Sequence, residues 1–162
     1  MLPFLILLVA GQPPQPLCEA ADRFLRTDRQ LVTVVEADTL DDWRTRKVLH
    51  GCRITAAGGT TRGVQAEAVG FYERVRAVGG WVRTPDPRDA PNEASLRFRA
   101  GTGDQAADCL FNVYGDAMLM TDAEQRVDEQ RPLQAGETRY HVYVMCTPAL
   151  PAAPRDGGMA SR

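Results

Sequence analysis

Few residue patterns that support common catalytic chemistry occur in this chain of 162 residues. Its only serines are Ser95 and Ser161, and neither lies in the G-x-S-x-G turn that presents a hydrolase nucleophile. Its only lysine, Lys47, follows no glycine-rich phosphate-binding loop, and the GTG at 101–103 lacks the third glycine of a dinucleotide fingerprint. These absences argue against serine hydrolases, P-loop enzymes and Rossmann dehydrogenases, so we predict no catalytic residue and no cofactor.

Metal-binding patterns are equally scarce. Histidine occurs twice, as His50 and His141, and no C-x-x-C pair is present. A zinc site built from His50 and Cys52 would need free thiolates. In an oxidising compartment, the cysteines are expected to form disulfides instead. We expect His50 in a loop and His141 exposed on the face of a strand opposite the core, and therefore predict no metal site.

The charge balance gives no reason to expect a nucleic acid or an anionic membrane as partner. The chain carries 19 Lys and Arg against 21 Asp and Glu, a formal net charge of -2. Because Lys47 is the only lysine, the other 18 of these 19 basic residues are arginines, scattered along the whole chain. We interpret that bias as the codon usage of a GC-rich bacterial genome.

The first ten residues, MLPFLILLVA, are uncharged and almost wholly apolar. This run is too short for a membrane span, which needs about 20 apolar residues. It matches the hydrophobic region of a signal peptide, with small residues around position 10 for cleavage. We therefore expect a signal peptide over residues 1–11, a periplasmic or extracellular location, and no membrane span after its removal.

Four cysteines, an even number, are typical of two disulfides in an exported chain, and three connectivities are open. Cys109 opens one strand pattern and Cys146 closes another. If these strands are antiparallel, the two cysteines lie near each other on one face. That geometry favours Cys109 with Cys146, and leaves Cys18 with Cys52.

Apolar spacing predicts helices from Leu17 and over 64–78, the second ended by Gly79 and Gly80. Thr39 followed by two acids indicates the start of another short helix. Gly58 and Gly59 are expected to break a strand, and the acidic run 122–137 is expected to be a loop. Alternating or β-branched residues predict strands over these segments: 31–35, 52–57, 81–82, 96–100, 109–114, 117–121 after a Gly115-Asp116 hairpin turn, and 139–146.

This order of elements predicts a single α+β domain over 17–146, with a mostly antiparallel sheet of about five to six strands and two or three helices packed on one face. Residues 12–16, rich in proline, are expected to be an extended linker. Residues 147–162 lack apolar periodicity and are expected to be a disordered tail.

Alternating Arg97 and Arg99, together with Arg53, form the best candidate for an anion-binding face, because guanidinium groups hold carboxylates and phosphates with paired hydrogen bonds. A charged sheet surface without a ligand is the simpler interpretation. The predicted function is thus a small exported disulfide-stabilised domain with a non-catalytic binding or structural role, whose partner is an unknown protein or small anionic ligand.

Two alternatives remain open. One is a hydrolase that uses loop carboxylates and arginines on a carbohydrate or a phosphate ester, since glycoside hydrolysis needs two acids. The simpler interpretation of its candidate carboxylates is that they are solvated residues in turns. These candidates are Asp104, Asp108, Asp116, Asp122 and Glu124. The other is a cytosolic domain with free thiols, which applies if residues 1–10 belong to the core.

Overall fold

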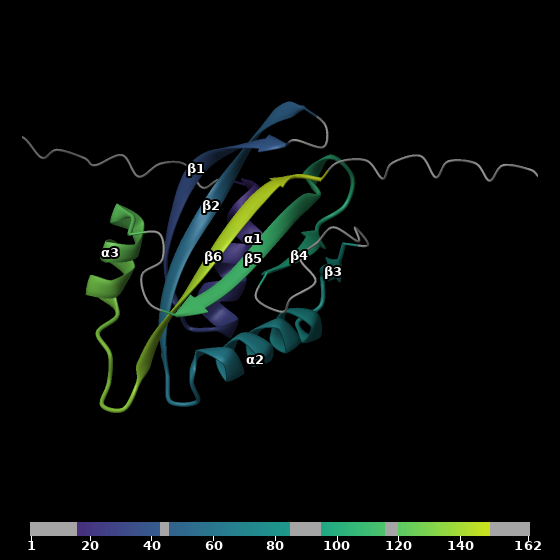
Figure 1. Cartoon of the computed structure of the whole chain (residues 1–162). Helices are drawn as coiled ribbons and strands as arrows, with labels where there is room; N and C mark the ends of the chain where they lie inside the picture. The colour runs from purple at the N-terminus through teal and green to yellow at the C-terminus, as the bar shows by residue number, and fades with distance from the viewer. Residues whose placement is uncertain (1–15, 43–45, 85–94, 116–119, 150–162) are drawn as a thin grey trace, which may run out of the picture.

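Figure 1 shows the chain as a computed structural model, which describes residues 16–42, 46–84, 95–115 and 120–149. One sheet of six strands has the order β1-β2-β6-β5-β4-β3, and every neighbouring pair is antiparallel. Three α-helices accompany the sheet within these residues. The predicted single α+β domain with a mostly antiparallel sheet is confirmed.

Helical elements precede β1 and separate β2 from β3, β4 from β5, and β5 from β6. The strands are β1 (Val32–Asp42), β2 (Lys47–Thr60), β3 (Trp81–Arg83), β4 (Ser95–Ala100), β5 (Ala107–Gly115) and β6 (Thr138–Pro148). The helical elements are η1 (Pro16–Cys18), α1 (Glu19–Arg23), η2 (Phe24–Asp28), α2 (Val64–Ala77), η3 (Gly103–Gln105) and α3 (Asp122–Gln130).

One face of the sheet, the core face, is covered by the N-terminal helical segment η1-α1-η2 and by α2 (Figure 1). Phe111 of β5 is fully buried at its centre, with rings of Phe71, Phe98 and Trp81 at centroid distances of 6.0, 5.9 and 5.4 Å. Such tilted and edge-to-face aromatic contacts add to the stabilisation that burial gives. The predicted helices from Leu17 and over 64–78 therefore form the cover of this core.

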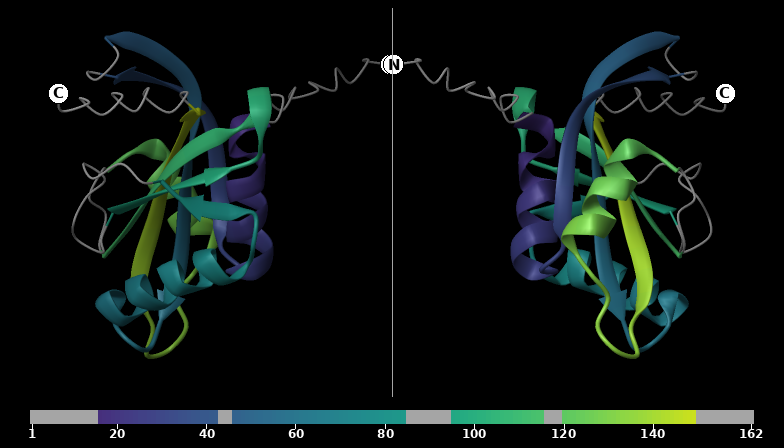
Figure 2. Two further views of the ribbon diagram at one scale, coloured as in Figure 1. Left: turned by 90° about the vertical axis from the view of Figure 1, so that its right-hand side faces the viewer. Right: turned by 90° about the vertical axis from the view of Figure 1, so that its left-hand side faces the viewer.

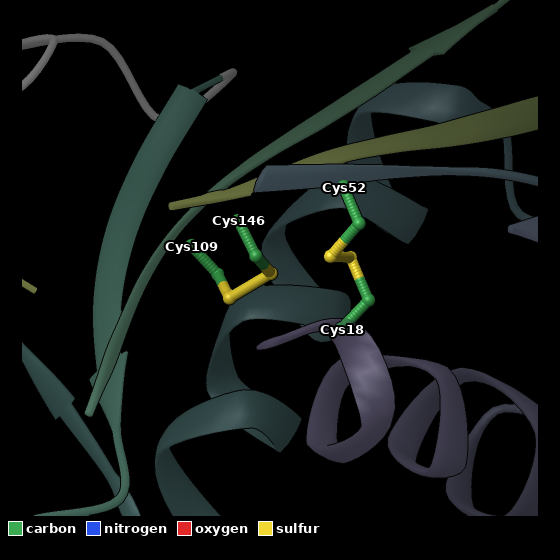
Figure 3. Close-up of a disulfide and its surroundings, with 4 residues drawn as sticks. All are labelled: Cys18, Cys52, Cys109 and Cys146. Carbon is green, nitrogen blue, oxygen red and sulfur yellow. A yellow bond between two sulfur atoms is a disulfide. The ribbon is translucent and has the colours of Figure 1, made fainter. Parts of the chain in front are cut away.

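One disulfide links the N-terminal helical segment to the core face of the sheet, and the other links two neighbouring strands on that face. Cys18 of η1 is bonded to Cys52 of β2, and Cys109 of β5 is bonded to Cys146 of β6 (Figure 3). None of the four cysteines is free, and all four side chains are fully buried. The pairing that the strand geometry favoured is confirmed, because Cys109 and Cys146 lie directly opposite each other in the β5–β6 ladder.

The predicted short helix after Thr39 is wrong. β1 continues to Asp42 and pairs with β2 without interruption, from Val32 opposite Ala57 to Asp42 opposite Lys47. The hydroxyl and acid signals for a helix start are local preferences of a few tenths to about one kcal/mol each. Eleven consecutive ladder positions outweigh them. Trp43 lies outside the described residues.

The predicted break at Gly58 and Gly59 is also wrong, since both residues belong to β2. A Cβ atom on Gly58 would lie 2.7 Å from Leu31 Cδ2 and 2.7 Å from the Tyr140 ring. Glycine is needed here because side chains from neighbouring elements cross the strand closely, and not because the chain turns.

The acidic segment predicted as a loop contains helix α3. Thr121 caps it: its hydroxyl accepts a hydrogen bond from the Glu124 amide at 3.2 Å, and the Glu124 carboxylate accepts one from the Thr121 amide at 3.1 Å. This reciprocal pair satisfies two amides that would otherwise lack partners. Figure 2 shows α3 on the side of the sheet away from α1.

Several predictions concern residues outside the described ranges: the signal peptide 1–11, residues 12–15 of the linker, and residues 150–162 of the tail. Pro16 belongs to η1, and β6 continues through Pro148. The hairpin partner of β5 predicted at 117–121 lies largely outside the described residues, and the described neighbours of β5 are β4 and β6. None of the described helices is long and apolar enough to cross a membrane.

Candidate functional site

The face of the sheet opposite the core, here called the open face, is only partly covered. Alternation along each strand places every second residue on it. Many of these residues are half-buried, in contrast to the buried residues of the core face. They include Glu36, Asp38 and Leu40 of β1, Arg53 of β2, Tyr143 and Met145 of β6, Leu110 and Asn112 of β5, and Arg97 and Arg99 of β4.

A shallow hollow of about 90 Å³ lies on this face. Its floor is Leu110 and Met145, which are direct neighbours in the β5–β6 ladder. Leu40 lines it from β1, which bends together with β2 toward this side of the sheet at its C-terminal end (Figure 2), and Arg97 lines it from β4. The remaining lining residues are Asp108, Thr147 and Pro148. The hollow is therefore apolar at its base and charged along one wall.

The three arginines predicted as an anion-binding face all lie on the open face, and two of them belong to one row. Arg53, Met145, Leu110 and Arg97 are successive partners across β2, β6, β5 and β4. Two apolar side chains thus separate the two guanidinium groups. Binding of an anion by these arginines stays a prediction.

Arg53 and Arg99 each contact a carboxylate on the neighbouring strand. Arg53 Nε donates to Glu36 Oε2 at 3.0 Å, and its Nη1 lies 3.7 Å from Asp38 Oδ2. Arg99 makes a two-bond contact with Asp108, Nε to Oδ1 at 2.7 Å and Nη2 to Oδ2 at 2.8 Å. These hydrogen bonds hold the pKa of both arginines above its ordinary value.

Tyr143 extends the polar side of the open face next to Arg53. Burial raises the pKa of its hydroxyl, and the neighbouring Asp38 carboxylate raises it further. The phenol therefore stays protonated and can donate a hydrogen bond throughout the physiological range. Tyr143 does not itself line the hollow, whose polar lining residues are Arg97, Asp108 and Thr147.

A second polar cluster lies under α3, at the other end of the open face. The Tyr114 hydroxyl donates to Glu124 Oε1 at 2.7 Å, and His141 Nε2 lies 2.8 Å from Asp128 Oδ1. Arg139 Nε is 3.2 Å from the same Asp128 oxygen, and the rings of Tyr114 and His141 stack at 5.4 Å. Burial and the Glu124 carboxylate raise the pKa of Tyr114. These contacts fix α3 to β5 and β6.

Both predictions for the histidines are wrong. His50 lies in β2 and not in a loop. The side chain of His141 is fully buried and not exposed. Its strand position opposite the core face was predicted correctly, but α3 covers that part of the face. The signal that could have located the helix is the T-x-x-E pattern formed by Thr121 and Glu124, which marks a helix start.

A third cluster surrounds Glu67 at the start of α2, on the core side. Its carboxylate contacts Arg29, accepts from Arg62 Nη2 at 2.9 Å, and accepts from the Thr60 hydroxyl at 3.0 Å. Burial alone would raise the pKa of Glu67, but the hydrogen bonds from Arg62 and Thr60 and the charge of Arg29 outweigh it and lower the pKa. The arrangement joins η2, β2 and α2.

The carboxylates considered for hydrolysis do not converge in the described part of the chain. Asp104 lies in η3, Asp108 is paired with Arg99, Asp122 lies in the first turn of α3, and Glu124 bonds to Tyr114. Asp116 lies outside the described ranges. Over residues 16–42, 46–84, 95–115 and 120–149, no group of three or more His, Cys, Asp or Glu is placed to hold a metal ion.

The fold and its open face define a disulfide-stabilised α+β domain with one covered and one partly open sheet face. No known protein family matches the sequence, and neither a curated protein nor a solved structure is similar to it.

Proposed function

We propose that the protein is an exported, disulfide-stabilised binding domain whose open face takes a small ligand with an apolar body and an anionic group. The observation that carries the proposal is the hollow, where Leu110 and Met145 form an apolar floor beside Arg97. Pairing an apolar surface with a few placed polar groups is characteristic of small-molecule sites.

The size and charge of the hollow limit the ligand. A volume of about 90 Å³ is about three times the ~30 Å³ that one water occupies in the liquid, so a single ring or a short aliphatic chain fits. The negative charge of Asp108 in the wall is balanced by Arg99 at 2.7 Å. Arg97 also lines the hollow, and a guanidinium recognises carboxylate or sulfonate oxygens through paired hydrogen bonds.

Export is the second element of the proposal. Two disulfides are characteristic of chains that fold in an oxidising compartment. The apolar run at the N-terminus supports the same location. In a bacterial expression host, we expect the chain in the periplasmic fraction with Gln12 as its first residue by N-terminal sequencing. An uncleaved chain confined to the cytosol would contradict export.

Binding is tested with benzenesulfonate, a probe that combines one aromatic ring with one sulfonate. We expect saturable binding to the native protein by isothermal titration calorimetry. Met145→Glu puts a carboxylate into the floor of the hollow, where it repels the anionic group of the probe. We expect the Kd to rise at least about tenfold, because a loss of ~1.4 kcal/mol of binding free energy already has that effect.

The matched control is Val48→Glu. Val48 is 61% exposed and lies on the other face of β2 from Arg53, so the same substitution adds the same charge away from the hollow. The control should bind the probe as the unmodified chain does, and thermal unfolding should show that both variants are folded. An equal loss of probe affinity in both variants, or unchanged affinity in Met145→Glu, would show that the probe binds elsewhere.

A further inference from the structure

The two disulfides share a single row of the sheet. Cys52, Cys146 and Cys109 are successive partners on β2, β6 and β5, with Cys52 opposite Cys146 and Cys146 opposite Cys109. All three point to the core face and are fully buried, and Cys18 of η1 is bonded to the outermost of them (Figure 3). Cys146 therefore has a cysteine neighbour on both sides, although it is bonded to only one.

Both neighbours of Cys146 lie within reach of bond exchange. Directly opposite residues in antiparallel strands have Cβ atoms about 4.5–5.5 Å apart, while a disulfide needs roughly 3.5–4.5 Å. A small adjustment of the β2–β6 pair therefore allows a bond between Cys52 and Cys146. Cys52 and Cys109 are different, because β6 lies between their strands. Two strand spacings separate them by about 9.5 Å, beyond the ~7 Å limit between Cα atoms.

We propose that the four cysteines form an internal thiol–disulfide relay in which Cys146 changes partner once the Cys18–Cys52 bridge is opened. A dithiol reductant opens that bridge, is itself oxidised to a disulfide, and leaves thiols at Cys18 and Cys52. The Cys52 thiolate, after loss of its proton, attacks Sγ of Cys146. The Cys146–Cys109 bond breaks, and the departing Cys109 thiolate takes up a proton.

The exchange conserves one bridge and two thiols but moves them to different elements. The sheet is then cross-linked between β2 and β6, and the thiols are at Cys18 and Cys109. The segment η1-α1-η2 has lost its covalent link to β2, and Cys52 is no longer free to restore it. The relay therefore acts as a latch that keeps the N-terminal helical segment untethered after reduction. It lies on the core face and does not depend on ligand binding at the open face.

The direct test is the variant Cys18→Ser, which leaves three cysteines in one row. Folded protein is held at pH 8 for about a day, because uncatalysed exchange takes seconds to hours. It is then quenched with acid, unfolded, labelled with N-ethylmaleimide and mapped by peptide mass spectrometry. We expect label on both Cys52 and Cys109, and bridges Cys52–Cys146 and Cys109–Cys146, with no Cys52–Cys109 bridge. Label on Cys52 alone would overturn the relay.

The control variant Cys18→Ser/Cys146→Ser removes the shared partner. Its two thiols should both remain free and labelled, and a Cys52–Cys109 bridge would overturn the geometric basis of the relay. A second route uses the unmodified chain, in case Cys18→Ser does not fold. One equivalent of dithiothreitol gives folded species with one bridge, among which a Cys52–Cys146 link is expected. Its absence after the same incubation would also contradict the proposal.

Discussion

Removing the Cys18–Cys52 bridge is the perturbation whose size follows most directly from the structure. The variant Cys18→Ala/Cys52→Ala leaves no free thiol at these positions and so avoids partner exchange. The sequence separation of 34 residues corresponds in the chain-entropy relation to about 3.8 kcal/mol at 25 °C. For the other bridge, with a separation of 37 residues, the same relation also gives about 3.8 kcal/mol.

The two bridges close separate, non-overlapping loops, so their effects on the unfolded chain should add. We expect each double variant to lose about 4 kcal/mol, and the chain without cysteines to lose nearly 8 kcal/mol. The second loss is comparable to the whole stability of an ordinary domain, about 5–15 kcal/mol. The cysteine-free chain should therefore be marginally folded or unfolded at 37 °C.

Urea unfolding followed by circular dichroism measures these losses. Because the bridge restricts the unfolded chain, its removal should also steepen the denaturant dependence, as the unfolded state exposes more surface. A loss below about 1 kcal/mol in both double variants, with unchanged slope, would refute the reasoning that the bridges act by constraining the unfolded state.

Three further predictions concern contacts outside the bridges. Gly51→Ala should cost about 2 kcal/mol, because its Cβ would overlap the backbone oxygen of Cys146; an unchanged urea midpoint contradicts this. Glu67→Gln should cost about 3 kcal/mol at pH 7, since Arg29 stays buried without its carboxylate. Because the pKa of Glu67 is lowered, this difference should be present above its unfolded pKa of about 4.3 and vanish as the pH falls through the folded value; a gap that persists at pH 2 contradicts it. Thr121→Ala should cost about 1 kcal/mol by thermal unfolding, through loss of the α3 cap, whereas Thr121→Ser should restore it.

The sequence was most informative where alternation or helical spacing coincided with the core. The helix over 64–78 and the strands that carry Cys109 and Cys146 were predicted because one side of each is apolar. The same alternation placed Cys109 and Cys146 on one face and so led to their pairing. The buried side of each of these elements requires apolar residues at regular spacing, and that spacing can be read directly from the sequence.

The wrong predictions fell where contacts distant in sequence decide the structure. The helix start after Thr39 was a local signal, and the partner strand β2 overrides it. The role of Gly58 depends on Tyr140, which is remote in the sequence. Helix α3 has few apolar residues, so its spacing gave no signal, and polar contacts such as Tyr114 to Glu124 hold it on the sheet.

The candidate site was only partly accessible from the sequence. Arg97 and Arg99 alternate along one strand, so their common face could be predicted. The hollow between Arg97 and the β1–β2 hairpin could not, because it depends on the strand order that places β2 beside β6 and so brings Leu40 to the same face as Met145 and Leu110. That order is set by hydrogen-bonded pairing between strands that are far apart in the sequence, such as β2 and β6.

The state of the four cysteines in protein directed to the periplasm of an expression host tests the central claim most directly. Protein recovered from the periplasm of an expression host is unfolded without reductant, exposed to N-ethylmaleimide and mapped by peptide mass spectrometry. We predict no added label, with Cys18 linked to Cys52 and Cys109 linked to Cys146. Four labelled cysteines would contradict the oxidised fold and remove the disulfide argument for export.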